Sequence, residues 1–382
     1  MQPTDLRVAL FSGNYNYVRD GANQALNKLV AHLLHRGAAV RVYSPTVARP
    51  AFAPAGDLVD VPAFPMIGGR GEYRVARGLP ARPRRDLEAF RPNLVHVSAP
   101  EFLGHAALRW ARRRGVPVVA SLHTRFETYF RYYGLGLVEP LLIRLLTRFY
   151  DRVDRVLVPG ESMAALIRDW GVSAPIGVWS RGVDHDRFDP ARRSLPWRRE
   201  LGIGDDEMAV GFLGRLVKEK GLDVFAEAAA ELARRGAPHR LLVVGDGPAR
   251  DWFAERVPGA VFAGFQEGDG LGRAVASMDV LFNPSVTETF GNVTAEAMAA
   301  GVPVVAARAT GAVDLIEQGR TGFLVPPRDV SAYADALARL AADPALRRVM
   351  GEAGHARAAR QRWDVVNEAV VRAYLEVMAA RA

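Results

Sequence analysis

The sequence predicts an α/β protein with two domains, each built around a parallel sheet. A chain of 382 residues is too long for one compact core and suits two domains of ordinary size. Short apolar runs typical of buried strands alternate with amphipathic segments of helical length, which is the order of βαβ units. This alternation starts again beyond residue 207, so a second sheet is expected there.

The first domain opens with a βαβ unit. A strand at Arg7–Ser12 is followed by a polar loop, a helix stopped by Gly37, and a second strand at Ala39–Tyr43. The helix carries apolar residues at 3.6 spacing, namely Leu26, Leu29, Val30, Leu33 and Leu34. Further buried strands are expected at Leu94–Val97, Val116–Leu122 and Arg155–Val158. The N-terminal domain should therefore be doubly wound.

The second domain follows a linker. The segment Trp179–Pro190 (WSRGVDHDRFDP) combines glycine, a closing proline and alternating charge, which is typical of a linker. A helix is expected at Gly221–Arg235, among strands at Met208–Leu213, Arg240–Val244, Ala260–Phe262, Val280–Phe282, Val304–Ala306 and Phe323–Val325. A last helix, Trp363–Met378, has an apolar stripe of Val365, Val366, Ala369, Val370 and Tyr374. We expect Rossmann-like domains at residues 1–183 and 184–362, with a C-terminal helix, 363–382, packing back toward the N-terminal domain.

Composition narrows the class of protein. The chain is 49% hydrophobic and 24% charged, as in a soluble globular enzyme. No apolar run approaches the roughly 20 residues of a spanning helix, and the segment Met1–Arg7 is too short and polar to begin a signal peptide. A cytoplasmic location is therefore expected. The absence of cysteine excludes disulfides, thiolate chemistry and sulfur-ligated zinc.

The net charge of +8 suggests a polyanionic partner, such as a membrane surface, nucleic acid or a phosphorylated substrate. An arginine bias often reflects only a GC-rich genome, so charge alone leaves the function open. A nucleic-acid-binding protein is the alternative from another class. No recognised binding motif or aromatic-interleaved basic stripe supports it.

The first motif with chemistry follows the first strand of the second domain. The segment Gly214–Gly221 (GRLVKEKG) places Arg215 and Lys220 in a loop bounded by glycines, just before a helix. Two cations at a helix N-terminus suit a diphosphate. A solvated basic turn would have the same sequence.

The second motif, VVGDGPAR, follows the next strand. Gly245 and Gly247 permit a tight turn that lets the backbone approach a ligand closely. Taken alone it also fits an ordinary βα turn with an Asp cap. No GxGxxG supports an NAD site.

The most specific motif is Asn283–Met298 (NPSVTETFGNVTAEAM). Glu288 lies in the loop after a strand, and Glu296 lies about one turn into the next helix. One carboxylate can then face a sugar ring and the other a ribose diol. Between them, Phe290, Gly291 and Asn292 present backbone N–H groups at the helix N-terminus, where the partial positive charge suits phosphate. The alternative makes Glu296 a first-turn charge that complements the helix dipole.

Two features of the N-terminal domain lie at the ends of strands. His123, in SLHT, follows a buried strand, although a lone histidine is often a satisfied structural residue. Asp20 and Gly21 follow the first strand and either cap a helix or line a cleft.

These motifs, with the following AMAAGVPVVAARATGAVDLIEQGRTGFLVPP, resemble in order and spacing the donor half of family 4 retaining glycosyltransferases. SLHTRFETYFRYYG and WSRGVDHDRFDP resemble segments of its lipid-glycosylating branch, which includes sulfoquinovosyl diacylglycerol synthases and phosphatidylinositol mannosyltransferases. The resemblance covers nearly the whole chain. It implies the GT-B fold, two Rossmann-like domains facing across a cleft.

The resemblance also implies roles for the motif residues. Arg215 and Lys220 would neutralise the donor diphosphate, Glu296 would bind the ribose hydroxyls, and Glu288 would contact the transferred sugar. His123 would lie against the sugar from the opposite domain. The remaining donor contacts would come from Gly21, Gly214, Gly245, Gly247, Phe290, Gly291, Asn292 and Val293. The family often has two adjacent glycines in the first loop, where this chain has Asp20, Gly21 and Ala22.

The implied reaction is front-face transfer with retention, in which the leaving phosphate helps to take the acceptor proton. The expected donor is a UDP-sugar carrying a hexose or hexuronic acid, with no cofactor and no metal. The expected acceptor is a membrane lipid; a cell-surface polysaccharide or a small molecule is the alternative. A phosphorylase would need a pyridoxal-bearing lysine, and the only lysines are Lys28, Lys218 and Lys220.

A peripheral position on the inner face of the cell membrane is expected from two segments. One contains the arginines Arg70, Arg74, Arg77, Arg82, Arg84 and Arg85. The other, Phe126–Tyr150, contains Phe130, Tyr132 and Tyr133, followed by Leu141, Leu142, Leu145 and Leu146. The alternative is a solvated basic face beside an ordinary core-facing helix.

Overall fold

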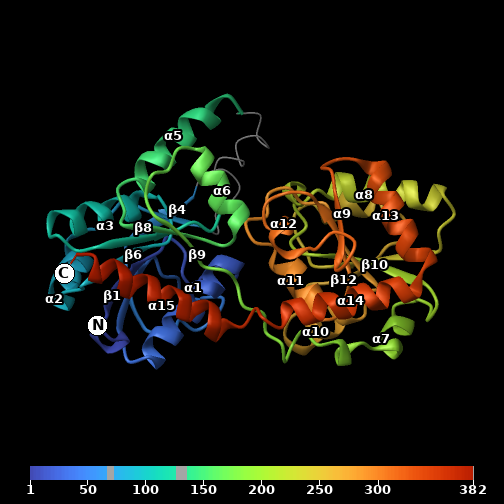
Figure 1. Ribbon diagram of the computed structural model, residues 1–382, viewed down its shortest axis with the longest axis horizontal. Coiled ribbons are helices and arrows are strands. Elements are labelled where there is room, and N and C mark those ends of the chain that lie inside the picture. Colours follow the sequence, from blue (N-terminus) through green and yellow to red (C-terminus); the bar gives the residue numbers. More distant parts are fainter. Residues whose placement is uncertain (67–72, 126–135, 382) are drawn as a thin grey trace. The chain divides into compact units, whose positions relative to one another are not determined.

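The computed structural model describes residues 1–66, 73–125 and 136–381. The chain forms two compact units (Figure 1). Unit 1 comprises Met1–Arg181 together with Trp363–Ala382, and unit 2 comprises Gly182–Arg362. Unit 1 is therefore assembled from two pieces of sequence that flank the whole of unit 2.

Unit 1 contains a seven-stranded parallel sheet with the order β3-β2-β1-β6-β7-β8-β9. The strands are β1 (Arg7–Phe11), β2 (Ala39–Ser44), β3 (Asp57–Asp60), β6 (Leu94–Val97), β7 (Val118–Ser121), β8 (Arg155–Val158) and β9 (Ile176–Val178). A small antiparallel ribbon pairs β4 (Ala63–Pro65) with β5 (Arg74–Ala76). The strand order reverses between β1 and β6, so the sheet is doubly wound, and ligands of such sheets bind at the carboxyl ends of the strands near that reversal.

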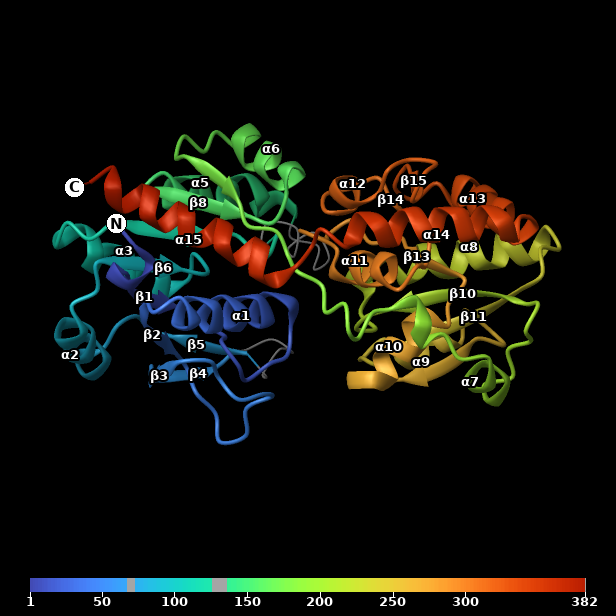
Figure 2. The same ribbon diagram turned by 60° about the horizontal axis from the view of Figure 1, so that its bottom comes forward.

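Helices cover both faces of this sheet (Figure 2). The helices α1 (Gly21–His35) and α15 (Trp363–Ala379) lie side by side over one face, where Leu29, Val370 and Tyr374 share a core. The other face packs against α2 (Ala81–Phe90), α3 (Phe102–Arg113), α5 (Glu139–Tyr150) and α6 (Glu161–Asp169). Each face thus has its own apolar core.

Unit 2 contains a six-stranded parallel sheet with the order β12-β11-β10-β13-β14-β15. Its strands are β10 (Met208–Leu213), β11 (His239–Val244), β12 (Val261–Gly264), β13 (Val280–Asn283), β14 (Val304–Ala307) and β15 (Gly322–Val325). Its helices are α7 (Leu195–Glu200), α8 (Leu222–Arg234), α9 (Arg250–Ala254), α10 (Gly268–Ala276), α11 (Asn292–Ala299), α12 (Ala312–Leu315), α13 (Val330–Ala342) and α14 (Pro344–Ala358). The sheet has a core on each face, one with α8, α9 and α13 and the other with α10, α11 and α12.

The predicted fold class of two Rossmann-like parallel sheets is confirmed, and the predicted strands match to within one or two residues. The short strands β3, β4, β5 and β9 were not predicted, because they lack the continuous apolar run of a buried strand.

The predicted apolar stripe of the last helix is wrong in part. Val365 is 54% exposed, whereas Asn367, Val370 and Tyr374 are buried. Asn367 lies in the buried line because its Oδ1 accepts a hydrogen bond of 3.3 Å from the Trp179 indole. Because a polar residue, Asn367, is part of the buried face, the buried face differs from the stripe that the apolar residues alone indicate.

None of the helices in the described part of the chain is long and apolar enough to cross a membrane.

Candidate functional site

The loops after β10 and β11 of unit 2 pack backbone against backbone. Gly245 has φ of +136°, and a Cβ built there would lie 1.9 Å from the Gly214 carbonyl oxygen. A Cβ at Gly247 would lie 2.5 Å from the Leu216 carbonyl oxygen. The Leu216 N–H donates to the Asp246 carbonyl at 2.9 Å. Both motif glycines are thus required by close approach of the two loops, at the edge of the sheet where ligands bind.

The loop after β13 joins the same cluster. The Thr287 hydroxyl donates to the Glu219 carbonyl at 3.2 Å. Lys220 Nζ lies 2.6 Å from Glu288 Oε1, with Glu288 only 15% exposed. The GRLVKEKG and ETFG motifs, separated along the chain, therefore meet through one charge-assisted hydrogen bond. Arg215 is exposed in the first of these loops.

Helix α11 begins at Asn292, with Gly291 at its N-cap in the left-handed region at φ of +93°. Only glycine adopts this conformation without strain. Phe290 is buried before the cap, and Val293 lies in the first turn. The first turn of a helix leaves N–H groups without intrahelical acceptors, so this end can receive phosphate oxygens.

Glu296 lies on the second turn of α11. Burial raises the pKa of its carboxyl to about 8, with Arg187 opposing the rise and Glu288 and Asp184 adding to it. A surface charge that only complemented the helix dipole would not be desolvated in this way. Strongly shifted carboxyls of this kind cluster at functional sites.

The charged residues Asp184 and Arg187, which act on Glu296, were not predicted from the sequence. Asp184 and Arg187 form an ion pair of 3.4 Å and belong to the segment interpreted as a linker. Glycine, proline and alternating charge indicate a linker whether its charges face solvent or a site, so composition could not distinguish the two.

In unit 1, Asp20 is the N-cap of α1, and its carboxylate accepts from the Asn23 N–H at 2.8 Å. Burial raises the pKa of Asp20. Gly21 is the first residue of the helix. Of the two roles open from the sequence, the structure shows capping for Asp20.

His123 follows β7 and is held through both ring nitrogens. Arg181 Nη2 lies 2.6 Å from Nδ1, and Ser121 Oγ lies 2.8 Å from Nε2. Burial, and then the charge of Arg181, lower the pKa of His123 well below its ordinary value. His123 is therefore neutral at pH 7 and lies at the predicted edge of the sheet. Arg181 was missed because it too belongs to the segment interpreted as a linker.

A second missed residue of unit 1 is Glu101, the N-cap of α3 after β6. A Cβ at Gly13 would lie 2.0 Å from its Oε2, so the loop after β1 closes over the carboxyl. Burial raises the pKa of Glu101 to about 7, although the Gly13 N–H hydrogen-bonds to it and opposes the rise. No motif marks Glu101 in the sequence, because its burial depends on the path of a loop that is distant along the chain.

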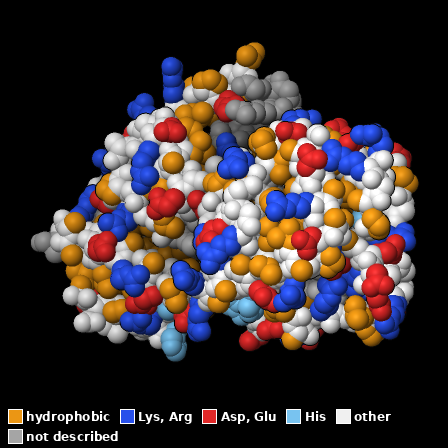
Figure 3. Space-filling model, turned by 45° about the vertical axis from the view of Figure 1, so that its right-hand side comes forward, with side chains coloured by type: hydrophobic (Ala, Val, Ile, Leu, Met, Phe, Trp, Pro, Cys, Tyr) orange, Lys and Arg blue, Asp and Glu red, His pale blue; other side chains and the backbone are white. Residues whose placement is uncertain are grey.

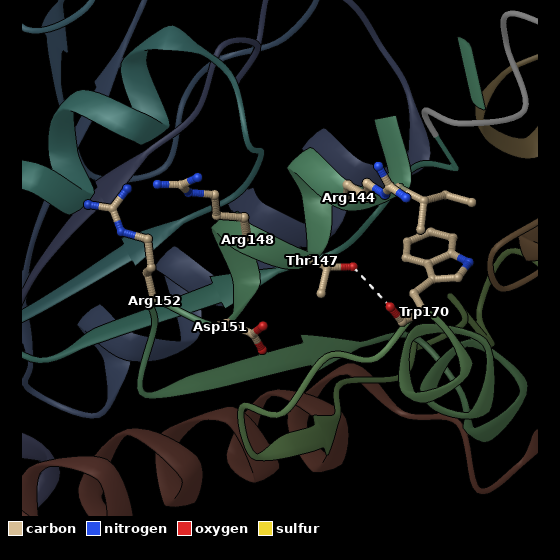
Figure 4. A pocket seen from close by; sticks show the side chains of 7 residues that line it. Arg144, Thr147, Arg148, Asp151, Arg152 and Trp170 are labelled. Carbon is tan, nitrogen blue, oxygen red and sulfur yellow. Dashed lines mark hydrogen bonds between the residues drawn. The ribbon is translucent and has the colours of Figure 1, made fainter. Parts of the chain in front are cut away.

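A shallow pocket lies between α5 and the end of α6, and it contains none of the predicted site residues (Figure 4). Arg144, Arg148 and Arg152 line it with Trp170. The Arg148 and Arg152 guanidinium groups point the same way, and that of Arg144 lies toward Trp170. The Thr147 hydroxyl donates to the Trp170 carbonyl at 3.3 Å and ties the two helices together.

The positive charge is not concentrated on the face drawn in Figure 3, where basic, acidic and apolar side chains are interspersed. Many arginines are paired; Arg235, for example, forms an ion pair of 2.8 Å with Glu231. A duplex needs several phosphate contacts from one basic surface, and the basic side chains of this face do not form one continuous surface. Within the described ranges, no three His, Asp or Glu side chains are grouped closely enough to hold a metal ion.

Two family models match the chain. The model described as Glycosyltransferase Family 4 matches residues 19–187. The model described as Glycosyl transferases group 1 matches residues 207–343. Together they cover every strand of the unit 2 sheet and every strand of the unit 1 sheet except β1.

Curated relatives cover the chain more fully. A GDP-mannose-dependent α-mannosyltransferase of Mycolicibacterium smegmatis is 33% identical over 98% of this chain and 99% of its own. The sulfoquinovosyl transferase of Arabidopsis thaliana is 35% identical over 76% of this chain and 58% of its own. An α-monoglucosyldiacylglycerol synthase of Streptococcus pneumoniae is 24% identical over 79% of this chain and 71% of its own.

Among solved structures, HepE from Anabaena in complex with UDP superposes with a TM-score of 0.75 at 20% identity, over 97% of this chain and 99% of its own. At this identity the likeness shows the fold alone. The resemblance identified from the motifs is confirmed by the family models and the relatives.

Proposed function

The chain belongs to glycosyltransferase family 4, and from that premise we propose that it transfers a hexosyl group, with retention, from a nucleotide diphosphate sugar to a hydroxyl of a membrane lipid. The observation that carries the donor half of this proposal is the meeting of three motif loops in unit 2, joined by the contact of 2.6 Å between Lys220 and Glu288.

In this proposal the diphosphate lies between Arg215, Lys220 and the N-terminus of α11. The two cations offset the charge that develops on the leaving phosphate, which can then help to accept the acceptor proton. Glu288 holds Lys220 and contacts the sugar. Glu296 receives the two ribose hydroxyls, which suit a buried carboxyl that needs hydrogen-bond donors.

The nucleotide is proposed to be UDP or GDP. A structural neighbour of this chain holds UDP, and one relative is named for its dependence on GDP-mannose. Turnover of a panel of UDP- and GDP-hexoses, with diacylglycerol lipids as acceptors, tests the proposal. Product formation with one donor, retained anomeric configuration by NMR, and loss of activity in Lys220→Ala are expected. Binding of no member of the panel would contradict the donor assignment.

A lipid acceptor is supported by one relative, whose name includes a diacylglycerol glycolipid. It is also supported by the outer face of α5. Leu141 and Leu145 on this helix are 58% and 55% exposed, whereas Leu146 faces the core. Of the other predicted membrane residues, Arg82, Arg84 and Arg85 are exposed on α2, Arg77 lies over the Phe64 ring, and Arg70, Phe130, Tyr132 and Tyr133 lie outside the described residues.

Beside the exposed leucines, Arg144, Arg148 and Arg152 repeat at intervals of four residues. In the part of the chain that the structure describes, none of them has an ion pair with a carboxylate, in contrast to Arg155, which pairs with Glu376 at 2.5 Å. Exposed leucines beside unpaired arginines are typical of a helix that lies in an anionic membrane surface, where each arginine contributes about 1 kcal/mol.

Vesicle co-sedimentation tests this part separately from catalysis. We expect stronger binding to vesicles with anionic lipid than to neutral ones, and at least about a tenfold loss when Arg144, Arg148 and Arg152 become glutamine. The matched control removes the same charge from unit 2, by changing the exposed Arg234, Arg320 and Arg348 to glutamine. Equal losses in the two triple variants would show a nonspecific charge effect and contradict the α5 surface.

A further inference from the structure

A series of hydrogen bonds between buried polar groups connects the last helix of unit 1 to His123. The Tyr374 hydroxyl on α15 is hydrogen-bonded to His96 Nδ1. His96 Nε2 lies 2.8 Å from Ser121 Oγ, which in turn lies 2.8 Å from His123 Nε2. The series ends where Arg181 Nη2 lies 2.6 Å from His123 Nδ1. His96, Ser121, Tyr374 and Arg181 are all 4% exposed or less.

The guanidinium of Arg181, at one end of this series of hydrogen bonds, determines which ring nitrogen of His123 carries the proton. A guanidinium only donates hydrogen bonds, so His123 Nδ1 must carry a lone pair and Nε2 must carry the proton. The Nε2–H group then donates a hydrogen bond to Ser121 Oγ. With Nδ1 accepting from Arg181 and Nε2 donating to Ser121, neither ring nitrogen of His123 is placed to accept a proton from a substrate.

The same groups surround Trp179. The His123 ring packs edge-on against the Trp179 indole at 5.2 Å between centroids, and the Arg181 guanidinium lies 5.0 Å from the ring centroid. The indole N–H donates to Asn367 on α15. Two residues of α15 therefore hold neighbours of this network in place: Asn367 holds the Trp179 indole, and Tyr374 holds His96.

This network includes residues next to both points where the polypeptide crosses from one unit to the other. Arg181 is the last residue of unit 1 before the first passage, and α15 begins directly after the second. Just beyond the first passage, the Val183 N–H donates to the Gln361 carbonyl at 2.8 Å, which joins the two passing segments.

We propose that Arg181 is a positioning residue that holds His123 as a fixed, neutral imidazole with its proton on Nε2. His123 then acts as a rigid wall for the bound sugar and takes no proton. Tyr374 holds His96, and His96 holds Ser121 in place to accept the hydrogen bond from His123 Nε2. Its role beside the sugar rests on the proposed function. The tautomer of His123 and its dependence on Arg181 do not rest on the proposed function.

Nitrogen NMR of the full chain with labelled histidine tests the tautomer without any substrate. His123→Gln assigns the signal. We expect a protonated Nε2 and an accepting Nδ1 in the natural sequence, retention of this pattern in Arg181→Lys, and its loss in Arg181→Met. Tyr374→Phe, a milder change, should alter the His96 signals and broaden those of His123. Arg155→Gln is the matched control, because it removes another arginine contact to α15 without touching the network.

Enzyme kinetics test whether the position of His123 affects turnover. In Arg181→Met we expect kcat to fall at least about tenfold while the Kd for UDP or GDP changes less than about twofold, since the proposed nucleotide contacts all lie in unit 2. Arg181→Lys should recover most of kcat. An unchanged His123 spectrum in Arg181→Met, or a protonated Nδ1 in the natural sequence, would overturn the inference. A clear tautomer result with no turnover of any nucleotide sugar would instead overturn the proposed function.

Discussion

Replacing Glu296 by glutamine should make the chain more stable at neutral and alkaline pH. Burial raises the pKa of Glu296 from 4.5 to about 8 in the folded chain. Between these values the folded state keeps a proton that the unfolded state has released. Stability associated with this group is therefore fully present below about pH 4.5 and is lost as pH rises toward 8.

The size of the effect follows from the shift. Each pH unit within this window costs at most about 1.4 kcal/mol, so raising the pH from 5.5 to 7.5 costs at most about 3 kcal/mol. Glutamine is neutral at every pH and nearly the same shape, so it removes this slope. For a domain of this size, about 1 kcal/mol shifts the Tm by roughly 2–4 °C.

Thermal unfolding of both proteins at pH 5.5 and 7.5 measures the difference. The Tm of Glu296→Gln should exceed that of the natural sequence by several degrees more at pH 7.5 than at pH 5.5. Glu227→Gln, on the exposed side of α8, is the control and should show no such difference. Parallel Tm values for the natural and Glu296→Gln chains across this range would refute the reasoning. Loss of nucleotide binding in the same variant would agree with a carboxyl kept for function at the expense of stability.

Three further results are expected. Lys220→Ala should lower turnover at least about tenfold with an unchanged circular dichroism spectrum, because its Nζ lies at the proposed diphosphate; unchanged kcat and donor affinity would remove Lys220 from the site. Gly245→Ala should lower the Tm of unit 2 more than Gly259→Ala, since both have positive φ but only Gly245 meets backbone atoms; equal losses in thermal scans would show that φ alone matters. Donor binding should change the small-angle scattering profile through domain closure about Trp179–Pro190, and identical profiles with and without donor would count against closure.

The sequence was sufficient for most strands of both sheets, because buried parallel strands are continuous apolar runs with short, regular separations, whereas β3 and β9 of unit 1 lack such runs. It also placed His123 at the carboxyl end of a strand and Glu288 in the loop after another, where the structure has them. It could not show that Lys220 and Glu288 touch, because that contact joins two loops that are adjacent only in the folded sheet.

Other parts of the candidate site depend on burial that no local pattern indicates. Arg181 looks like a charged linker residue in the sequence, yet it is 4% exposed against the His123 ring. Glu101 has the sequence context of an ordinary helix cap, yet its carboxyl is desolvated by burial and lies against Gly13. Both lie in tertiary contacts rather than in periodic segments, which is why periodicity missed them.

The discontinuity of unit 1 has a consequence for the order in which the chain folds. The His96–Tyr374 hydrogen bond joins residues 278 positions apart, whereas unit 2 is one uninterrupted stretch. Contacts between distant segments form late, because a long loop must be closed first. Unit 2 should therefore fold first, leaving the groove for Val370 and Tyr374 uncovered until α15 arrives. A peptide of α15 added during refolding would compete for that groove and trap unit 1 with the helix supplied from outside.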